Sequence, residues 1–124
     1  MRTFESFTLH PKLILSGINL KLTAAMKAMF AEKLERLLRH EPGIVRVRVD
    51  VEDESRRGAP KFTAKGRVEI PGPDLLASTT TDDAYKSVDM LIDRLDRMLR
   101  KRTTALMNRR HADDIRDHVE AGVT

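Results

Sequence analysis

The sequence predicts an α+β fold of two layers, a β-α-β-β-β-α sandwich in which two helices cover one face of a four-stranded sheet. Apolar residues recur with helical spacing over two segments, 24–40 and 83–110. Over 45–52 and 62–70 they instead alternate with polar residues, which is typical of strands that bury one face. Because each predicted helix has a single apolar stripe, both helices must cover the same face of the sheet.

The first helix is predicted between a short strand and a proline-glycine stop. Residues 12–17 are mostly apolar and end at a glycine, as expected for a strand. Thr23 is a good N-cap. The apolar residues that follow it have amphipathic spacing: Met26, Phe30, Leu34, Leu37 and Leu38. Pro42 and Gly43 stop this helix at His40, and its length of about 16 residues suits a parallel, right-handed crossover.

Three further strands and a second helix complete the order. Valines alternate with charged residues over 45–52, and a similar alternation covers 62–70. After a Pro-Gly-Pro turn, residues 75–81 form a third extended segment, and Asp82 or Asp83 caps the last helix. The two connections between these strands are short, which predicts antiparallel hairpins.

The chain of 124 residues is predicted to hold one domain, at 12–111. Residues 1–11 are interpreted as a loosely held N-terminal extension. Residues 112–124 carry one arginine against four acidic residues and have no bulky apolar periodicity, which indicates a flexible C-terminal tail.

Composition and motifs argue against several classes of protein. The absence of cysteine excludes disulfides, thiolate zinc sites and a cysteine nucleophile. The sequence has no dinucleotide-binding, P-loop, HExxH or serine-elbow motif, so we expect neither an enzyme nor a cofactor or small-molecule substrate. No secretory signal and no apolar run long enough to span a membrane is present, which predicts a cytoplasmic protein.

Two groups of acidic residues are candidate ligand sites. Asp89 and Asp93 stand at i, i+4 and could hold a metal, but no histidine or third carboxylate completes a site. Surface ion pairs from Asp93 to Arg97 and from Asp96 to Arg100 are the better interpretation. The acidic residues of 50–54 lead into a Ser-Arg-Arg-Gly loop, and solvation of a hairpin tip explains them without a ligand.

The outer face of the second predicted helix is densely cationic. At about 100° per residue, five cations gather opposite the apolar stripe within roughly 120°: Lys86, Arg94, Arg97, Arg100 and Lys101. From Arg97 to Asp113 no acidic residue intervenes, so like charges repel by about 0.2–0.5 kcal/mol per i, i+4 pair unless an anion binds. The first helix and the exposed sheet face add further cations: Lys27, Lys33, Arg36, Arg39, Arg46, Arg48, Lys65 and Arg67.

Two interpretations of this cationic face remain. It is either a solvated surface that keeps a basic protein soluble, or a binding surface for a polyanion; the formal net charge is +4. Aromatic residues make up only 4% of the chain, which disfavours a single-strand reader that stacks bases on aromatic rings. The pattern therefore favours contacts to the phosphate backbone of a folded RNA.

Two segments of the sequence resemble a known family. Residues 83–101 read Asp-Ala-Tyr-Lys-Ser-Val-Asp-Met-Leu-Ile-Asp-Arg-Leu-Asp-Arg-Met-Leu-Arg-Lys, and residues 14–23 read Ile-Leu-Ser-Gly-Ile-Asn-Leu-Lys-Leu-Thr. Both are similar to segments of the ribosome hibernation promoting factors, also called ribosome-associated inhibitors or sigma-54 modulation proteins. Val88 stands where the family pattern has isoleucine, and the resemblance extends from about Leu13 to His111. The element order is also that of the family, and is similar to double-stranded RNA-binding domains.

The resemblance implies a stress factor that binds the small ribosomal subunit, with its 16S-type rRNA, and silences idle ribosomes. Such proteins occupy the channel between head and body, where they overlap messenger and transfer RNA in the decoding region. A chain of this size is expected to be the short form, without the domain that pairs two ribosomes, and to be monomeric off the ribosome. Whether such a short form promotes or blocks the pairing of ribosomes is left open.

The resemblance also implies which residues contact rRNA, namely Lys86, Arg94, Arg97, Arg100, Lys101 and Arg102, with Lys33 and Arg36 of the first helix as weaker candidates. Tyr85 matches the family pattern but lies on the apolar stripe, so we interpret it as a core anchor whose hydroxyl seeks a partner. The alternative function is a regulatory module that docks through its basic helix on an acidic protein such as a transcription factor.

Overall fold

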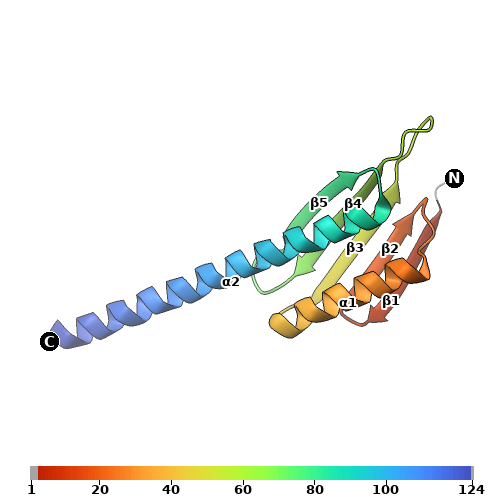
Figure 1. Ribbon diagram of the computed structural model, residues 1–124. Helices are drawn as coiled ribbons and strands as arrows, with labels where there is room; N and C mark the ends of the chain where they lie inside the picture. The colour runs from red at the N-terminus through yellow and green to blue at the C-terminus, as the bar shows by residue number, and fades with distance from the viewer. Residues whose placement is uncertain (1–2, 124) are drawn as a thin grey trace.

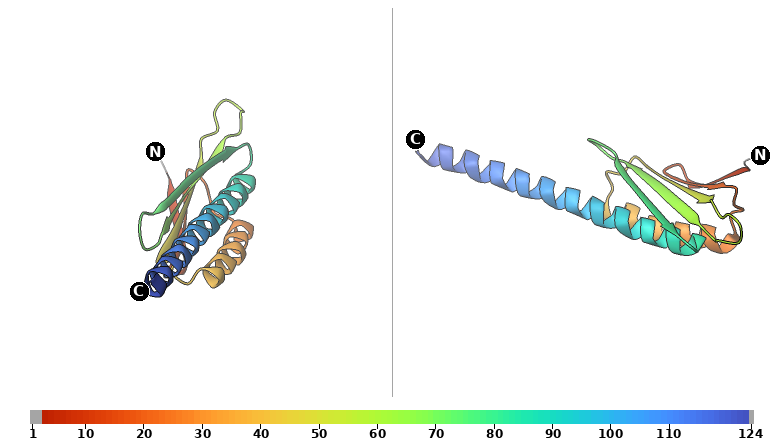
Figure 2. Two further views of the ribbon diagram at one scale, coloured as in Figure 1. Left: turned by 90° about the vertical axis from the view of Figure 1, so that its left-hand side faces the viewer. Right: turned by 90° about the horizontal axis from the view of Figure 1, so that it is seen from above.

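A five-stranded mixed sheet with two helices on one face makes up the fold (Figures 1 and 2). The computed structural model describes residues 3–123, with side chains described except at positions 9, 106 and 108–123. The elements are β1 (Phe4–His10), β2 (Leu13–Ile18), α1 (Ala24–His40), β3 (Arg46–Asp53), β4 (Phe62–Glu69), β5 (Leu75–Thr81) and α2 (Ala84–Val123). The strands lie in sequence order; β2 and β3 are parallel and all other neighbours are antiparallel.

The structure confirms the strands and helices predicted for the domain. In several cases it also confirms the residue at which an element begins or ends. Helix α1 begins after Thr23, whose Oγ1 accepts a hydrogen bond from the backbone N–H of Met26 at 3.1 Å, and it ends at His40. Asp83 caps α2, since its Oδ1 accepts from the backbone N–H of Tyr85 at 3.0 Å. The parallel pairing of β2 with β3 across α1 confirms the predicted crossover.

The predictions of a four-stranded sheet and of a loosely held N-terminal extension are both wrong. Residues Phe4–His10 form β1, a fifth strand that pairs antiparallel with β2 at the edge of the sheet. Pro11 lies in the tight turn between them, where its fixed φ is favourable, rather than at a break in structure. Glu5 fixes the strand further, because its carboxylate accepts from the backbone N–H of Leu22 at 3.1 Å and pairs with Lys27.

Helix α2 is longer than the sequence predicts. Its 40 residues give a length of about 60 Å, and its C-terminal part projects beyond the sheet (Figure 1). The backbone is helical through Val123, where an irregular tail was expected after residue 111. The division of the chain into extension, domain and tail otherwise stays a prediction.

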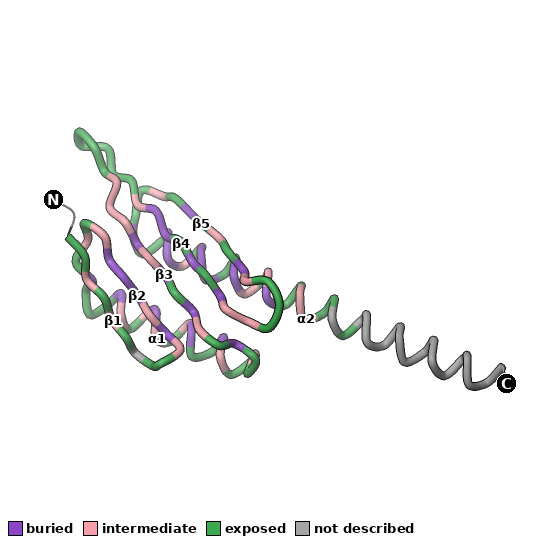
Figure 3. Tube along the Cα trace, turned by 180° about the vertical axis from the view of Figure 1, so that it is seen from behind, coloured by how far each residue is buried: buried purple, intermediate pink, exposed green. Residues whose placement is uncertain are grey.

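The core lies between the sheet and the two helices. Along β3, for example, buried residues alternate with less buried ones (Figure 3). The largest fully buried side chains of the core come from both layers: Phe30, Leu13, Leu15, Met26, Leu34, Ile44, Leu91 and Leu95. At Gly66 of β4 the helix α2 approaches closely, since a Cβ there would lie 2.7 Å from Cδ1 of Leu95. This contact holds the buried stripe of α2 against the sheet and so directs its opposite side toward solvent. No helix in the described part of the chain has the length and apolar character needed to cross a membrane.

Candidate nucleic-acid interface

The side of α2 opposite the core carries a row of exposed cations. Lys86, Arg97 and Lys101 are all exposed, and none has an ion-pair partner among the described residues. Arg97 and Lys101 are about one turn, or ~6 Å, apart along the helix axis. The buried residues Val88, Leu91, Leu95 and Leu99 occupy the other side of the same turns. We call Lys86, Arg97 and Lys101 the outer cation row.

Two further predicted contact residues bond to β5, the edge strand beside α2, and to the turn that precedes it. Nη1 of Arg94 donates to the backbone carbonyl of Ser78 at 2.7 Å, and Nη1 of Arg102 donates to that of Pro73. The first bond gives a partner to a carbonyl of the edge strand, and the second to a carbonyl of the turn before it. They fix the two side chains without neutralising them, because a carbonyl carries no net charge. A guanidinium has five N–H donors, so each still has donors for a phosphate.

The remaining predicted contact residues differ in how far they are neutralised. Arg100 pairs with Asp96 at 3.1 Å, as predicted, and Lys33 of α1 pairs with Asp89 of α2. Arg36 is exposed and has no ion pair within the described chain. The prediction that Asp93 pairs with Arg97 is not confirmed, since this pair is absent from the ion pairs of the described residues.

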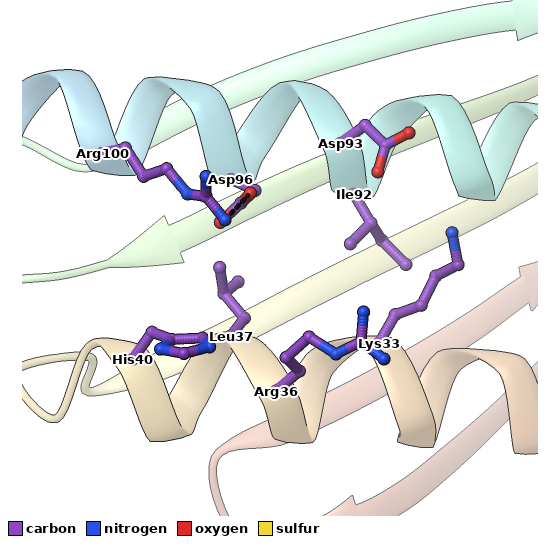
Figure 4. Close-up of a pocket in the computed structure, with 8 residues that line it drawn as sticks. All are labelled: Lys33, Arg36, Leu37, His40, Ile92, Asp93, Asp96 and Arg100. Atoms are coloured by element: carbon purple, nitrogen blue, oxygen red, sulfur yellow. Dashed lines mark ion pairs between the residues drawn. The ribbon is translucent and has the colours of Figure 1, made fainter.

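A shallow groove of mixed charge separates α1 from α2 on the solvent side (Figure 4). Lys33, Arg36 and His40 line it from α1, opposite Asp93 and Asp96 of α2. Arg100 also lines the groove and pairs with Asp96, whereas Asp93 has no ion pair among the described residues and opposes a polyanion at this point. The interface that the geometry favours therefore runs along the outer side of α2, with α1 at its margin.

A metal site at Asp89 and Asp93 has no support in the structure. Within the described residues no group of three or more potential ligands comes together. Asp89 instead faces Lys33, and this ion pair ties α1 to α2. The carboxylate thus takes part in joining the helices.

Tyr85 joins the beginnings of the two helices. Its hydroxyl forms a hydrogen bond with Oγ1 of Thr23, the residue that caps α1. This confirms the prediction that the hydroxyl has a hydrogen-bond partner. The prediction that Tyr85 is mainly a core anchor is wrong, because 36% of the residue is exposed. It lies at the margin of the apolar stripe, and its hydroxyl reaches the residue that caps the neighbouring helix.

Replacing Tyr85 by phenylalanine is expected to lower the free energy of unfolding by about 0.5–1.5 kcal/mol, because one hydrogen bond between the helices is lost and the ring is kept. Thermal unfolding monitored by circular dichroism measures the loss. Thr23→Ser, which keeps both the cap and a hydroxyl, is the matched control and should cost less. An unchanged melting temperature in Tyr85→Phe would show that water replaces the bond at no cost.

The acidic residues before the β3–β4 connection are engaged locally. Oδ1 of Asp53 accepts from the backbone N–H of Ser55 at 2.9 Å, and Glu54 pairs with Lys61 at 3.8 Å. The pKa of Glu54 is lowered, mainly by a hydrogen bond with the side chain of Thr63; desolvation, the next largest effect, acts in the opposite direction, and Lys61 and other nearby cations lower the pKa further. Glu54 is thus charged near neutral pH, and both acidic side chains already have local partners.

The fold and the outer cation row together define a class of protein: an α+β sandwich with exposed cations on a helix that packs against the sheet. Comparison with known proteins then gives the family. Residues 13–107 match the family described as sigma 54 modulation protein / S30EA ribosomal protein, and the chain belongs to this family. The matched segment contains the whole of the outer cation row and all the other predicted contact residues.

Individual relatives agree with this assignment. A ribosome hibernation promoting factor of Pseudomonas putida is 31% identical over 87 residues, which cover 70% of this chain and 81% of the relative. The crystal structure of the N-terminal domain of Protein Y from Thermus thermophilus is similar with a TM-score of 0.55 and 29% identity, covering 72% of this chain and 92% of that one. A ribosomal subunit interface protein from Coxiella burnetii shares the fold, with a TM-score of 0.61 and 22% identity over 75% of this chain and 96% of that one.

Proposed function

We propose that this protein is a ribosome hibernation factor that binds the small ribosomal subunit through phosphates of its rRNA. In this proposal it occupies the decoding channel, excludes messenger and transfer RNA, and so inhibits translation under stress. The outer cation row is the observation that carries the proposal, because these charges are exposed, unpaired within the described chain and fixed on a docked helix. Membership in a family that includes ribosome hibernation promoting factors supports the ribosome as partner.

The geometry suits contacts to a phosphate backbone better than reading of bases. Arg97 and Lys101 project from successive turns of one rigid helix, so they can meet phosphates at fixed separation. Arg94 is held at the β5 edge and Arg102 at the turn before β5, by one donor each, and both can offer other donors in a planar, bidentate arrangement. Because side chains that are already fixed lose little entropy on binding, this arrangement favours affinity.

The ion pairs at Arg100 and Lys33 do not prevent these two residues from joining the interface. In the pair of Arg100 with Asp96, 75% of the arginine side chain is exposed. Exposed pairs contribute only about 0–1 kcal/mol, so a phosphate can displace the carboxylate at small cost. We therefore propose the contacts in two groups: the outer cation row with Arg94 and Arg102 first, and Arg100, Lys33 and Arg36 as secondary contacts.

Co-sedimentation with purified small ribosomal subunits over a salt series tests the proposal. Neutralising about six phosphates predicts that the logarithm of the binding constant falls against that of salt concentration with a slope near −4 to −5. Addition of the protein to a cell-free translation reaction should inhibit synthesis at concentrations that saturate the subunits. Lack of co-sedimentation even at low salt would refute the proposal, and would favour a regulatory module that docks on an acidic protein.

A further inference from the structure

The connection between β3 and β4 is an ordered projection rather than a loose loop. Figure 1 shows it extending beyond the end of the sheet where α2 begins. We call residues 54–61 the finger. Backbone hydrogen bonds pair its two arms: Glu54 N–H to Lys61 O at 2.8 Å, and Arg56 with Ala59 in both directions at 3.1 and 2.9 Å. The Ser55 hydroxyl accepts from the backbone N–H of Lys61 at 2.9 Å, where the ladder would otherwise be interrupted.

The base of the finger is fixed to the first turns of α2. The Ser87 hydroxyl donates to the backbone carbonyl of Phe62 at 2.9 Å, and Ser87 itself is fully buried. Lys86, the first member of the outer cation row, is its neighbour in sequence. The finger and the cationic helix are therefore parts of one rigid frame, and what binds along α2 can extend to the finger.

The tip of the finger carries cations whose acidic neighbours are already occupied. All residues from Ser55 to Lys61 are exposed. Asp53 accepts from the Ser55 N–H and Glu54 is paired with Lys61, whereas Arg56 and Arg57 have no ion pair among the described residues. No large apolar side chain stands at the tip. Two arginines without an apolar anchor fit a polyanion rather than an apolar groove of a protein partner.

Arg57 occupies a position where the backbone disfavours it. The two residues of the turn, Arg57 and Gly58, have φ angles of +50° and +76°. A two-residue turn of this kind, with positive φ at both positions, is most favourable as Asn-Gly, and a side chain such as arginine is strained in the left-handed region. Solvation of the tip does not require that strain, because asparagine is equally polar. Arginine at this position goes against the preference of such turns for asparagine or glycine and gives no structural benefit. We therefore take its presence as a sign that the side chain has a role in binding.

We propose that the finger is a second RNA-binding element, in which the Arg57 guanidinium, with Arg56 beside it, binds backbone phosphates of the RNA that α2 contacts. This inference rests on the proposed function and deepens it, since it adds a contact outside the helices. It concerns the arginines of the tip, and leaves the interpretation of the acidic residues at 50–54 as solvated unchanged. We propose an electrostatic contact to backbone phosphates, because the tip has no aromatic residue on which bases could stack.

Binding of the full chain to purified small ribosomal subunits tests this inference, with Kd measured at several salt concentrations. Arg57→Asn should raise Kd about three- to tenfold and reduce the salt slope by about 0.7–0.9, the contribution of one phosphate. The same variant should melt at or above the wild-type temperature, because asparagine suits the turn better. Arg57→Lys keeps the charge and should retain most of the affinity and the slope. Arg39→Asn, at the far end of α1, is the matched control and should bind like the wild type.

The outcomes separate this inference from the proposed function. Wild-type binding with an unchanged Kd and slope in Arg57→Asn would overturn the finger contact and leave the proposed function standing. A lower melting temperature in Arg57→Asn would assign the arginine to the turn itself, which also overturns the inference. If the wild type fails to bind subunits even at low salt, the proposed function and the finger contact fail together.

Discussion

Replacing Lys86, Arg97 and Lys101 together by glutamate is expected to raise the Kd for the small ribosomal subunit at least a hundredfold, or about 2.7 kcal/mol. Three attractive contacts to phosphate are lost, and three repulsive ones take their place. The salt slope should fall by about 2–3, since each lost phosphate contact contributes about 0.7–0.9. Equilibrium binding over a salt series measures both quantities.

We expect this variant to fold like the wild type, so that a loss of affinity can be assigned to the lost phosphate contacts. The three residues are exposed and have no ion pair within the described chain, so their replacement breaks no contact that the structure shows. We expect the free energy of unfolding to change by less than about 1 kcal/mol. Arg100 is left in place deliberately, because its replacement would also leave Asp96 without its partner.

A charge-matched control distinguishes a specific surface from general attraction. Lys21→Glu, Arg39→Glu and Arg48→Glu together change the net charge by the same amount, and all three residues are exposed away from the outer cation row. This control should lose much less affinity than the α2 variant. If both variants lose affinity equally, binding depends on net charge alone, and the outer side of α2 is not the interface.

The elements that sequence predicted well are those in which local chemistry and periodicity agree. The alternating valines of β3, the threonine cap of α1 and the Pro-Gly stop after it each depend on neighbours in sequence. β1 was missed because apolar and polar residues alternate only weakly along it, although it forms a hairpin with the neighbouring strand: Phe4 pairs with Ile18, and Thr8 with Ile14. Without a clear alternation, the sequence shows no signal that residues 4–10 continue the sheet beyond the predicted strand at 12–17.

The sequence predicts which side of α2 carries the candidate site, but not the contacts that individual side chains make there. Helical spacing correctly separated the buried residues of α2 from its exposed cations. It could not show that Arg94 bonds to β5 and Arg102 to the turn before it, because these segments lie beside α2 only in the folded chain. Nor could it find the strained turn at Arg57, since the sequence reports residue types and not φ angles.

Replacing Leu95 by alanine tests the other half of the proposal, that the core holds the cationic helix in place. Leu95 is fully buried, and its Cδ1 faces Gly66 of β4. Removing it should lower the free energy of unfolding by about 2–5 kcal/mol, which is a large part of the stability of a single domain. Thermal and denaturant unfolding measure this loss.

Leu95→Ala and the glutamate variant of α2 should fail in opposite ways. Well below its melting temperature, Leu95→Ala should bind subunits with nearly the wild-type salt slope, because the outer cation row is intact. Its binding should be lost on warming, as the fold that positions α2 melts. A changed slope at low temperature would mean that the loss of Leu95 shifts α2 within a domain that is still folded.

Gly66→Ala shows whether Gly66 and Leu95 are in direct contact. In the wild type the added methyl group would lie 2.7 Å from Cδ1 of Leu95, so α2 or the leucine must move and the variant should be destabilised. In the Leu95→Ala background the same methyl group enters the space that the leucine leaves, so the added cost should vanish or change sign. We expect a coupling energy of about 0.5–3 kcal/mol from this double-mutant cycle. Equal effects of Gly66→Ala in both backgrounds would show that the helix does not rest on β4 at this point.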